Sequence, residues 1–140
     1  FNPSTGVLST IASTARYADL AELYSADADY EPGTVVSIGG NQEITVSGVD
    51  GDRLVAGVVS TNPSYTMNSE LDADYPVAVA LQGRVPCMVQ GKIKRGDLMV
   101  SAGNGRARSE SNPAIGTVIG KALADFDSEA GTIEIMVGKH

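Results

Sequence analysis

The sequence predicts a mainly β protein, folded as one compact barrel or sandwich with a short helix at its N-terminal end. Short runs of β-branched and apolar residues recur at roughly the 8–12-residue spacing that is typical of such folds. Turn signals rich in Gly, Asn and Asp separate these runs. Helical patterning of useful length occurs only before residue 25. The length of 140 residues and the apolar fraction of 42% fit one domain with a sizeable core.

Residues 1–24 form the first expected unit, a lead-in followed by a short helix, arranged like a stalk. Pro3 and Gly6 mark residues 1–7 as extended chain or turn. Apolar side chains then recur at a spacing of three and four, which predicts a helix over 13–24. A helix this short, with such small side chains, needs a surface, either on its own domain or along a trimer axis. The side chains expected in an oligomer interface are Leu8, Ile11, Ala15, Leu20 and Leu23.

Residues 25–140 form the second expected unit, a β-rich domain. Its longest irregular stretch is the segment 61–76, and loops of that length often carry function or pack on a neighbour. Tyr65, Met67 and Leu71 in this segment are therefore second candidates for the interface. Strands are expected at residues 34–38, 43–47, 54–60, 77–81, 85–89, 97–101, 106–109, 114–124 and 132–137.

The β-rich domain also shows an internal repeat when the sequence is laid over itself so that Gly33 aligns with Gly96. Its halves span roughly 31–60 and 94–123, and each reads as a turn glycine, a strand, a Gly-Asn turn, a second strand and a third strand. We interpret them as two similar β-units packed into one barrel-like core. The alternative is coincidence among glycine-rich turns. The other coinciding pairs include Gly40 with Gly103, Asn41 with Asn104, Val55 with Val118 and Gly57 with Gly120.

Composition excludes several classes of function. The net charge of −7 argues against a protein that wraps nucleic acid, and no apolar run is long enough to insert in a membrane. The single cysteine, Cys87, rules out an intrachain disulfide framework and reads as a buried, inert thiol. The single histidine, His140, ends the chain, so neither a Ser-His-Asp site nor a zinc site is predicted, and we expect no cofactor. Because the chain does not begin with Met, we expect a fragment or a processed piece.

Charge is distributed unevenly along the chain. Residues 1–80 carry eleven acids and two bases, whereas residues 81–140 carry six acids and eight bases. Two differently solvated faces are the favoured interpretation. The alternative is charge complementarity between subunits, which would fix their register in an oligomer.

Two groups of acids are candidates for chemistry. The sequence Asp-Ala-Asp-Tyr occurs twice, and carboxylates two apart in a loop can share a hard cation. The full calcium-loop pattern is missing, so solvated loop acids are favoured and no metal site is predicted. On the expected helix, Asp19 and Glu22 would share one face and could act as an acid–base pair, although a solvated helix face is favoured. The acids of the repeated sequence are Asp27, Asp29, Asp72 and Asp74.

From about residue 13 onward the chain resembles the C-terminal domains of bacteriophage tail-fibre and neck-appendage proteins. The resemblance keeps its order along the chain. Its most specific pieces are Gly-Val-Val-Ser-x-x-Pro and Gly-Lys-x-Lys-x-Gly-Asp-Leu, taken together. The stretches that carry it are residues 18–24, 30–36, 54–63, 67–68, 83–86 and 91–101.

Related domains include the intramolecular-chaperone autoproteolytic type called peptidase G2, which helps a fibre to trimerise and then cuts itself off. Its Asp-x-Ala-Glu motif matches Asp19, Ala21 and Glu22. The family has a small hydroxyl residue before that Asp, whereas this chain has Ala18. The departure argues against self-cleavage, so we expect no enzyme and keep cleavage at the Ala18–Asp19 bond as an alternative.

The resemblance implies a structural domain of the virion that caps and trimerises a tail fibre or appendage, in contact with other virion proteins. A homotrimer is expected because the lead-in and short helix are poor elements for a monomer. No nucleic acid or membrane partner is expected. A further alternative is a knob that binds a host receptor or glycan through an exposed aromatic platform. The only large candidates for that platform are Tyr17, Tyr24, Tyr30, Tyr65 and Tyr75.

Overall fold

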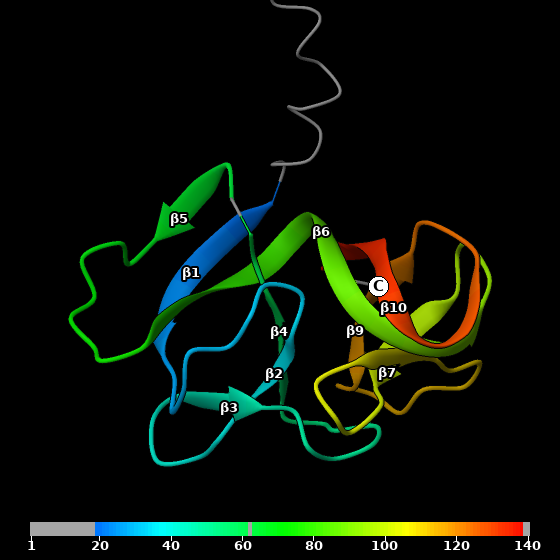
Figure 1. Ribbon diagram of the computed structural model, residues 1–140, viewed down its shortest axis with the longest axis horizontal. Coiled ribbons are helices and arrows are strands. Elements are labelled where there is room, and N and C mark those ends of the chain that lie inside the picture. Colours follow the sequence, from blue (N-terminus) through cyan, green and yellow to red (C-terminus); the bar gives the residue numbers. More distant parts are fainter. Residues whose placement is uncertain (1–18, 62, 139–140) are drawn as a thin grey trace, which may run out of the picture.

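The computed structural model describes residues 19–61 and 63–138, and this part of the chain is all β, which confirms the predicted class (Figure 1). One long strand, β6, crosses the molecule and takes part in both of its halves. The ten strands are β1 (Leu20–Ser25), β2 (Val35–Ile38), β3 (Ile44–Val46), β4 (Val55–Val59), β5 (Tyr65–Met67), β6 (Pro76–Ile93), β7 (Leu98–Ser101), β8 (Ala107–Ser109), β9 (Val118–Ala122) and β10 (Phe126–Val137).

The helix expected over 13–24 is wrong for residues 20–24, which lie in β1, and residues 13–18 lie outside the described part. Strand β1 pairs antiparallel with the first half of β6, from Leu20 opposite Gln82 to Ser25 opposite Pro76. Ala21, the second residue of the strand, is fully buried. Pairing with a segment far along the chain therefore overrides the local three-and-four spacing of apolar side chains.

Five strands close into a mixed barrel in the second half of the chain, here called the C-terminal barrel. It consists of the second half of β6 with β7–β10. Strand β10 pairs with β6 and β9, β9 with β7, β7 with β8, and β8 returns to β6 in parallel. Side chains such as Met99, Ile119 and Ile135 fill it. Closure leaves this unit without a free edge strand.

The remaining strands form what we call the N-terminal lobe, which consists of β1–β5 and the first half of β6 (Figure 1). Strand β6 pairs with β1 and β4, β4 with β2, and β2 with β3. A single bridge between Ala26 and Ile44 links the end of β1 to β3. Val35, Val58 and Ala80 belong to lobe strands but pack in the core of the C-terminal barrel. A second apolar cluster, which includes Ile44 and Val79, lies within the lobe.

Three strands of the first half have the same spacing along the chain as three strands of the second half. The offset that aligns Gly33 with Gly96 also carries the bounds of β2, β3 and β4 onto those of β7, β8 and β9. Turn hydrogen bonds follow the same offset. The Gly33 amide donates to the Val59 carbonyl at 2.8 Å, and the Gly96 amide donates to the Ala122 carbonyl at 2.8 Å.

Two glycines at corresponding positions allow strands to approach closely. A Cβ atom at Gly57 would lie 2.5 Å from the Ala80 carbonyl oxygen, and one at Gly120 would lie 2.1 Å from the Met136 carbonyl oxygen. Each glycine faces a register shift, in β2 and in β7 respectively. A side chain at either position would push two paired strands apart.

Candidate functional site

Two segments that the sequence singles out separately lie side by side in the structure. Strand β5 pairs in parallel with β1, which places Leu20 opposite Tyr65 and Glu22 opposite Met67. The Asn68 amide group donates to the Leu23 carbonyl at 3.1 Å and holds the end of β5 in place. We call this pair of strands the β1–β5 surface (Figure 1).

The β1–β5 surface carries apolar side chains that stay partly accessible, with Leu20, Tyr65 and Met67 on one face and Leu23 on the other. Tyr65 is 64% exposed, whereas Leu20, Leu23 and Met67 are half-buried. Leu71 is half-buried in the loop that follows β5. The other interface candidates, Leu8, Ile11 and Ala15, lie outside the described residues.

Asp19 and Glu22 do not share a helical face, because β1 is a strand. Side chains three positions apart on extended chain point to opposite faces. Asp19 is buried, and its carboxylate accepts a hydrogen bond from the Ser60 hydroxyl at 2.7 Å. Glu22 instead accepts the Tyr24 hydroxyl at 3.1 Å. The premise of an acid–base pair on one helix face is therefore wrong, and a catalytic role for these residues stays a prediction.

Asp19 ties the start of β1 to the segment that leads into β5. Its backbone carbonyl accepts hydrogen bonds from the Ser64 amide at 3.0 Å and the Ser64 hydroxyl at 3.1 Å. Together with the Ser60 contact, these bonds fix both Ser60 and Ser64 to the start of β1. The arrangement supports a structural role for this buried carboxylate.

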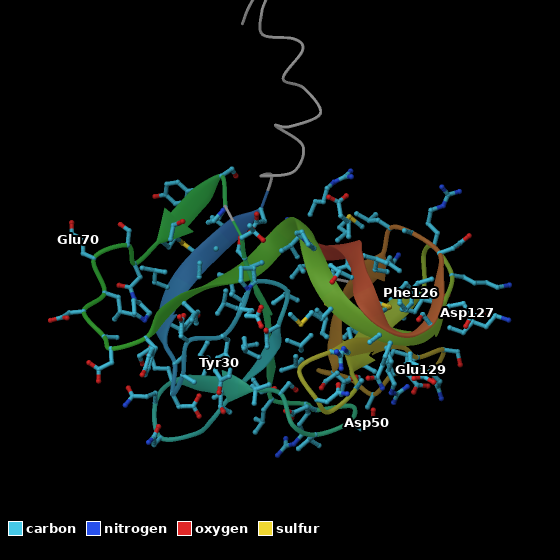
Figure 2. All side chains as sticks on the ribbon, in the orientation of Figure 1. Tyr30, Asp50, Glu70, Phe126, Asp127 and Glu129 are labelled. Carbon is cyan, nitrogen blue, oxygen red and sulfur yellow. The ribbon has the colours of Figure 1, made fainter. Side chains whose placement is uncertain are left out.

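The exposed tyrosines do not gather into one platform. Tyr65 lies beside the start of β1, and Tyr75, 45% exposed, lies beside its end, where the Tyr75 carbonyl accepts the Ala26 amide. Tyr24 and Tyr30 pack against the core of the N-terminal lobe; Figure 2 labels Tyr30. Tyr17 lies outside the described residues.

The repeated loop acids have different roles. The Asp27 carboxylate accepts hydrogen bonds from the hydroxyls of Tyr30 and Thr45, which together hold its pKa below the usual value. Asp29, Asp72 and Asp74 are exposed. Within residues 19–61 and 63–138, no three Asp, Glu, His or Cys side chains come together as a metal site would need.

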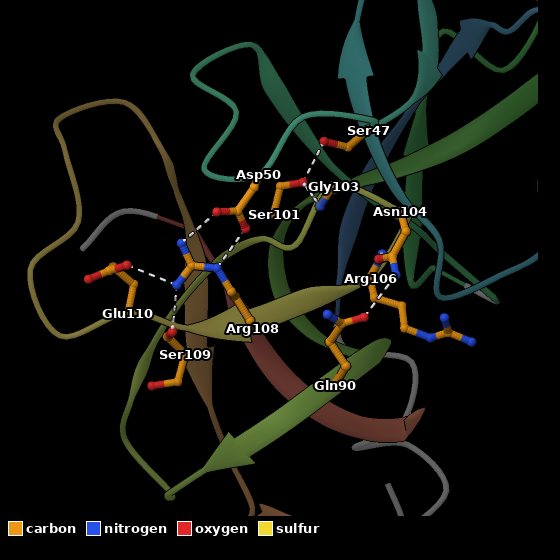
Figure 3. Close-up of polar contacts among 10 residues, drawn as sticks. All are labelled: Ser47, Asp50, Gln90, Ser101, Gly103, Asn104, Arg106, Arg108, Ser109 and Glu110. Atoms are coloured by element: carbon orange, nitrogen blue, oxygen red, sulfur yellow. Dashed lines mark hydrogen bonds and ion pairs between the residues drawn. The ribbon is translucent and has the colours of Figure 1, made fainter. Parts of the chain in front are cut away.

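An ion-pair network missed by sequence reasoning joins the two halves (Figure 3). The Arg108 guanidinium on β8 donates to both carboxylate oxygens of Asp50, at 2.7 and 3.1 Å, and to Glu110 at 2.8 Å. The hydrogen bond from Arg108 is the largest cause that lowers the pKa of each carboxyl. Bidentate geometry fixes the Asp50 turn against the barrel.

Buried serines continue this junction. The Ser47 and Ser101 hydroxyls lie 2.7 Å apart, one from each half (Figure 3). Asp52 accepts the Ser37 hydroxyl at 2.7 Å and the Leu54 amide at 2.9 Å. Burial of Asp52 opposes ionisation, but these hydrogen bonds outweigh it and lower its pKa. No local pattern predicts a contact such as that between Ser47 and Ser101, because the two serines lie far apart in the sequence.

The N-terminal lobe also has an open cavity of about 650 Å³, here called the lobe cavity, which the sequence does not predict. Its walls include Tyr24, Ile38, Ala56 and Leu81, one from each of four different strands. Cys87, in contrast, is fully buried in the barrel, and burial raises the pKa of its thiol to about 12. That environment fits the predicted inert thiol.

The described part of the chain contains no helix with the length and apolar character that a membrane span requires. No family model matches the chain, and no curated protein matches it. Among solved structures, the chain is similar to the head fibre gp8.5 N base of bacteriophage phi29, with 14% identity and a TM-score of 0.49. The similarity covers 84% of this chain and 92% of that one. Function therefore has to be argued from the residues.

Proposed function

We propose that this chain is a structural domain of a phage fibre or appendage, which assembles as a homotrimer through its N-terminal segment and the β1–β5 surface. The observation that carries the proposal is the parallel pairing of β1 with β5. It joins Leu20, an interface candidate of the first segment, to Tyr65, a candidate of the second. The ordered sequence resemblance to phage fibre domains supplies the biological setting, but it does not distinguish a head fibre from a tail fibre.

The chemistry of the β1–β5 surface suits contact between subunits. Tyr65 offers a large apolar ring with a polar tip, a residue type that is enriched where proteins meet. The neighbouring Leu20 and Met67 are only half-buried in one chain, so a second subunit would remove further apolar area from water. Strand β5 pairs in the described structure with β1 alone, so its other edge presents unpaired backbone groups to a neighbouring subunit.

The predicted internal repeat belongs to the same proposal. We infer that the lobe and the barrel are two versions of one β-unit. The common offset of three strand bounds and the matching close approaches at Gly57 and Gly120 support this inference. Such a double unit would serve as a rigid block at the end of a fibre.

Light scattering with inline chromatography, followed by intact mass of the same peak, tests the assembly. A trimer of full-length chains is expected, and a monomer overturns the proposal. Tyr65→Asp should weaken the trimer, so that it dissociates at a higher protein concentration than the wild type. Tyr75→Asp, which lies beside the other end of β1, should leave that concentration unchanged. A trimer whose chains have lost residues 1–18 would instead support self-cleavage at the Ala18–Asp19 bond.

A further inference from the structure

The lobe cavity has an apolar wall that the lobe itself does not fill. Ile38 on its rim remains 59% exposed, and Val55 and Leu81 are only half-buried. The polar part of the rim comes from the β2–β3 turn, where Glu43 is held by the Ser25 amide at 2.9 Å. A volume of about 650 Å³ lies in the range of pockets that bury drug-sized groups, roughly 300–1,000 Å³.

The C-terminal barrel provides an internal comparison, because three of its strands lie at the same offset from the lobe strands that line or border the cavity. The cavity-lining residues Tyr24, Ile38, Ile44 and Ala56 have counterparts at the offset that aligns Gly33 with Gly96. Those four counterparts are all buried: Cys87, Ser101, Ala107 and Ile119. The largest contrast is at Ile38, which is 59% exposed, whereas its counterpart Ser101 is fully buried. The lining residue Val55 shows no such contrast, because its counterpart Val118 is also half-buried.

The barrel in turn presents an apolar side chain that no other residue within 19–61 and 63–138 covers. Ile115 is 101% exposed at the tip of the loop between β8 and β9. Residues 111–117 of this loop carry no charge. The Thr117 hydroxyl and amide both donate to the Ala114 carbonyl, at 2.7 and 3.3 Å, which holds the tip as a formed turn. A fixed, uncharged tip loses little conformational entropy when it docks.

The charges of the two halves favour contact between different copies. The cavity belongs to the half with eleven acids and two bases, and Ile115 belongs to the half with six acids and eight bases. Like halves repel and unlike halves attract, so the charge pattern directs the barrel of one copy to the lobe of another.

We propose that the Ile115 tip of one copy inserts into the lobe cavity of a second copy. This inference rests on the proposed assembly, since it names a contact between neighbouring subunits in addition to the β1–β5 surface. Pro113 and Ala114 would follow Ile115 into the mouth and cover Ile38 and Leu81. Each copy supplies one tip and one cavity, so the contact can close a ring of three copies.

Site-directed crosslinking tests the contact directly. Chains carrying Ile38→Cys are co-expressed with chains carrying Ile115→Cys and treated with a mild oxidant. A disulfide forms only where the two Cβ atoms come within about 4.5 Å, so a covalent dimer of mixed composition is expected. Neither variant expressed alone should crosslink. In that case, the tip of one copy would have to contact the tip of another, or one cavity would have to contact another cavity. The native Cys87 is fully buried and does not take part.

The matched control replaces Ile38→Cys with Val49→Cys, since Val49 is 60% exposed and lies outside the cavity. No mixed dimer is expected from that combination. The inference is overturned if the mixed Ile38 and Ile115 variants give no crosslink, or no more than the Val49 control. The solution mass of the wild-type protein, measured by light scattering, separates the two proposals. A wild-type trimer combined with no crosslink overturns the tip-in-cavity contact alone. A wild-type monomer overturns the proposed assembly.

Discussion

At the scale of single residues, glycine positions carry constraints that a substitution can expose. Gly120→Ala would place a Cβ 2.1 Å from the Met136 carbonyl oxygen in the paired strand β10, and neither backbone can move without breaking ladder bonds. We expect a loss of about 3 kcal/mol in the free energy of unfolding, the upper part of the usual range for overpacking. Urea denaturation measures it. Gly48→Ala is the control, because nothing lies within 4 Å of its Cβ, and a loss of similar size there would contradict the argument.

The ion pairs of Arg108 give stability a defined dependence on pH. Asp50 and Glu110 have lowered pKa values in the folded chain, mainly because Arg108 donates hydrogen bonds to them. Their contribution is present above the unfolded pKa values, about 4, and is lost as the pH falls through the lower folded values. Stability should therefore decline below about pH 5, and Arg108→Gln should flatten that decline. Thermal unfolding across the acidic range up to neutral pH tests this, with the exposed Arg95→Gln as the control. An unchanged pH profile in the Arg108 variant would count against the ion pairs.

At the scale of elements, a side-chain hydrogen bond from Asn68 anchors the C-terminal end of β5 to β1. Asn68 has a φ of 59°, a region where Asn is tolerated better than most residues, and it donates to the Leu23 carbonyl. Asn68→Ala should cost about 1 kcal/mol of stability and speed amide hydrogen exchange in β5. Exchange measured by mass spectrometry checks it. Asn41→Ala in the β2–β3 turn should leave β5 unchanged, and equal effects from both variants would show that Asn68 does not anchor β5.

The elements also show where sequence reasoning succeeded and failed. Strands bounded by glycine turns, such as β2 and β4, lie close to the predicted ranges, because alternation and turn residues are local signals. The sequence predicts a helix where β1 forms, because the spacing of its apolar side chains fits either structure and only the pairing with β6 decides. It predicts two strands, at 77–81 and 85–89, where β6 is continuous, because pairing with β10 keeps the chain extended past Gly83. The tip at Ile115 and the open cavity depend on three-dimensional packing and have no local signal.

At the scale of the whole molecule, the lobe and the barrel should unfold together. Strand β6 belongs to both, and Val35, Val58 and Ala80 of the lobe complete the core of the barrel. The Asp50–Arg108 pair and the Ser47–Ser101 contact add polar links across the junction. One half cannot open without exposing apolar surface of the other, which predicts a single cooperative transition.

The chain carries separate natural probes for its two halves. All five tyrosines lie before residue 76 and there is no tryptophan, so intrinsic fluorescence reports the lobe. Cys87, with a raised pKa and no exposure, reacts with a thiol reagent only when the barrel opens. Urea midpoints from tyrosine fluorescence and from Cys87 labelling should coincide. If labelling began at lower urea than the fluorescence change, the barrel would be an independent folding unit, and the shared core would not couple the two halves. Val58→Ala should lower both midpoints together, because this lobe residue is fully buried in the barrel core.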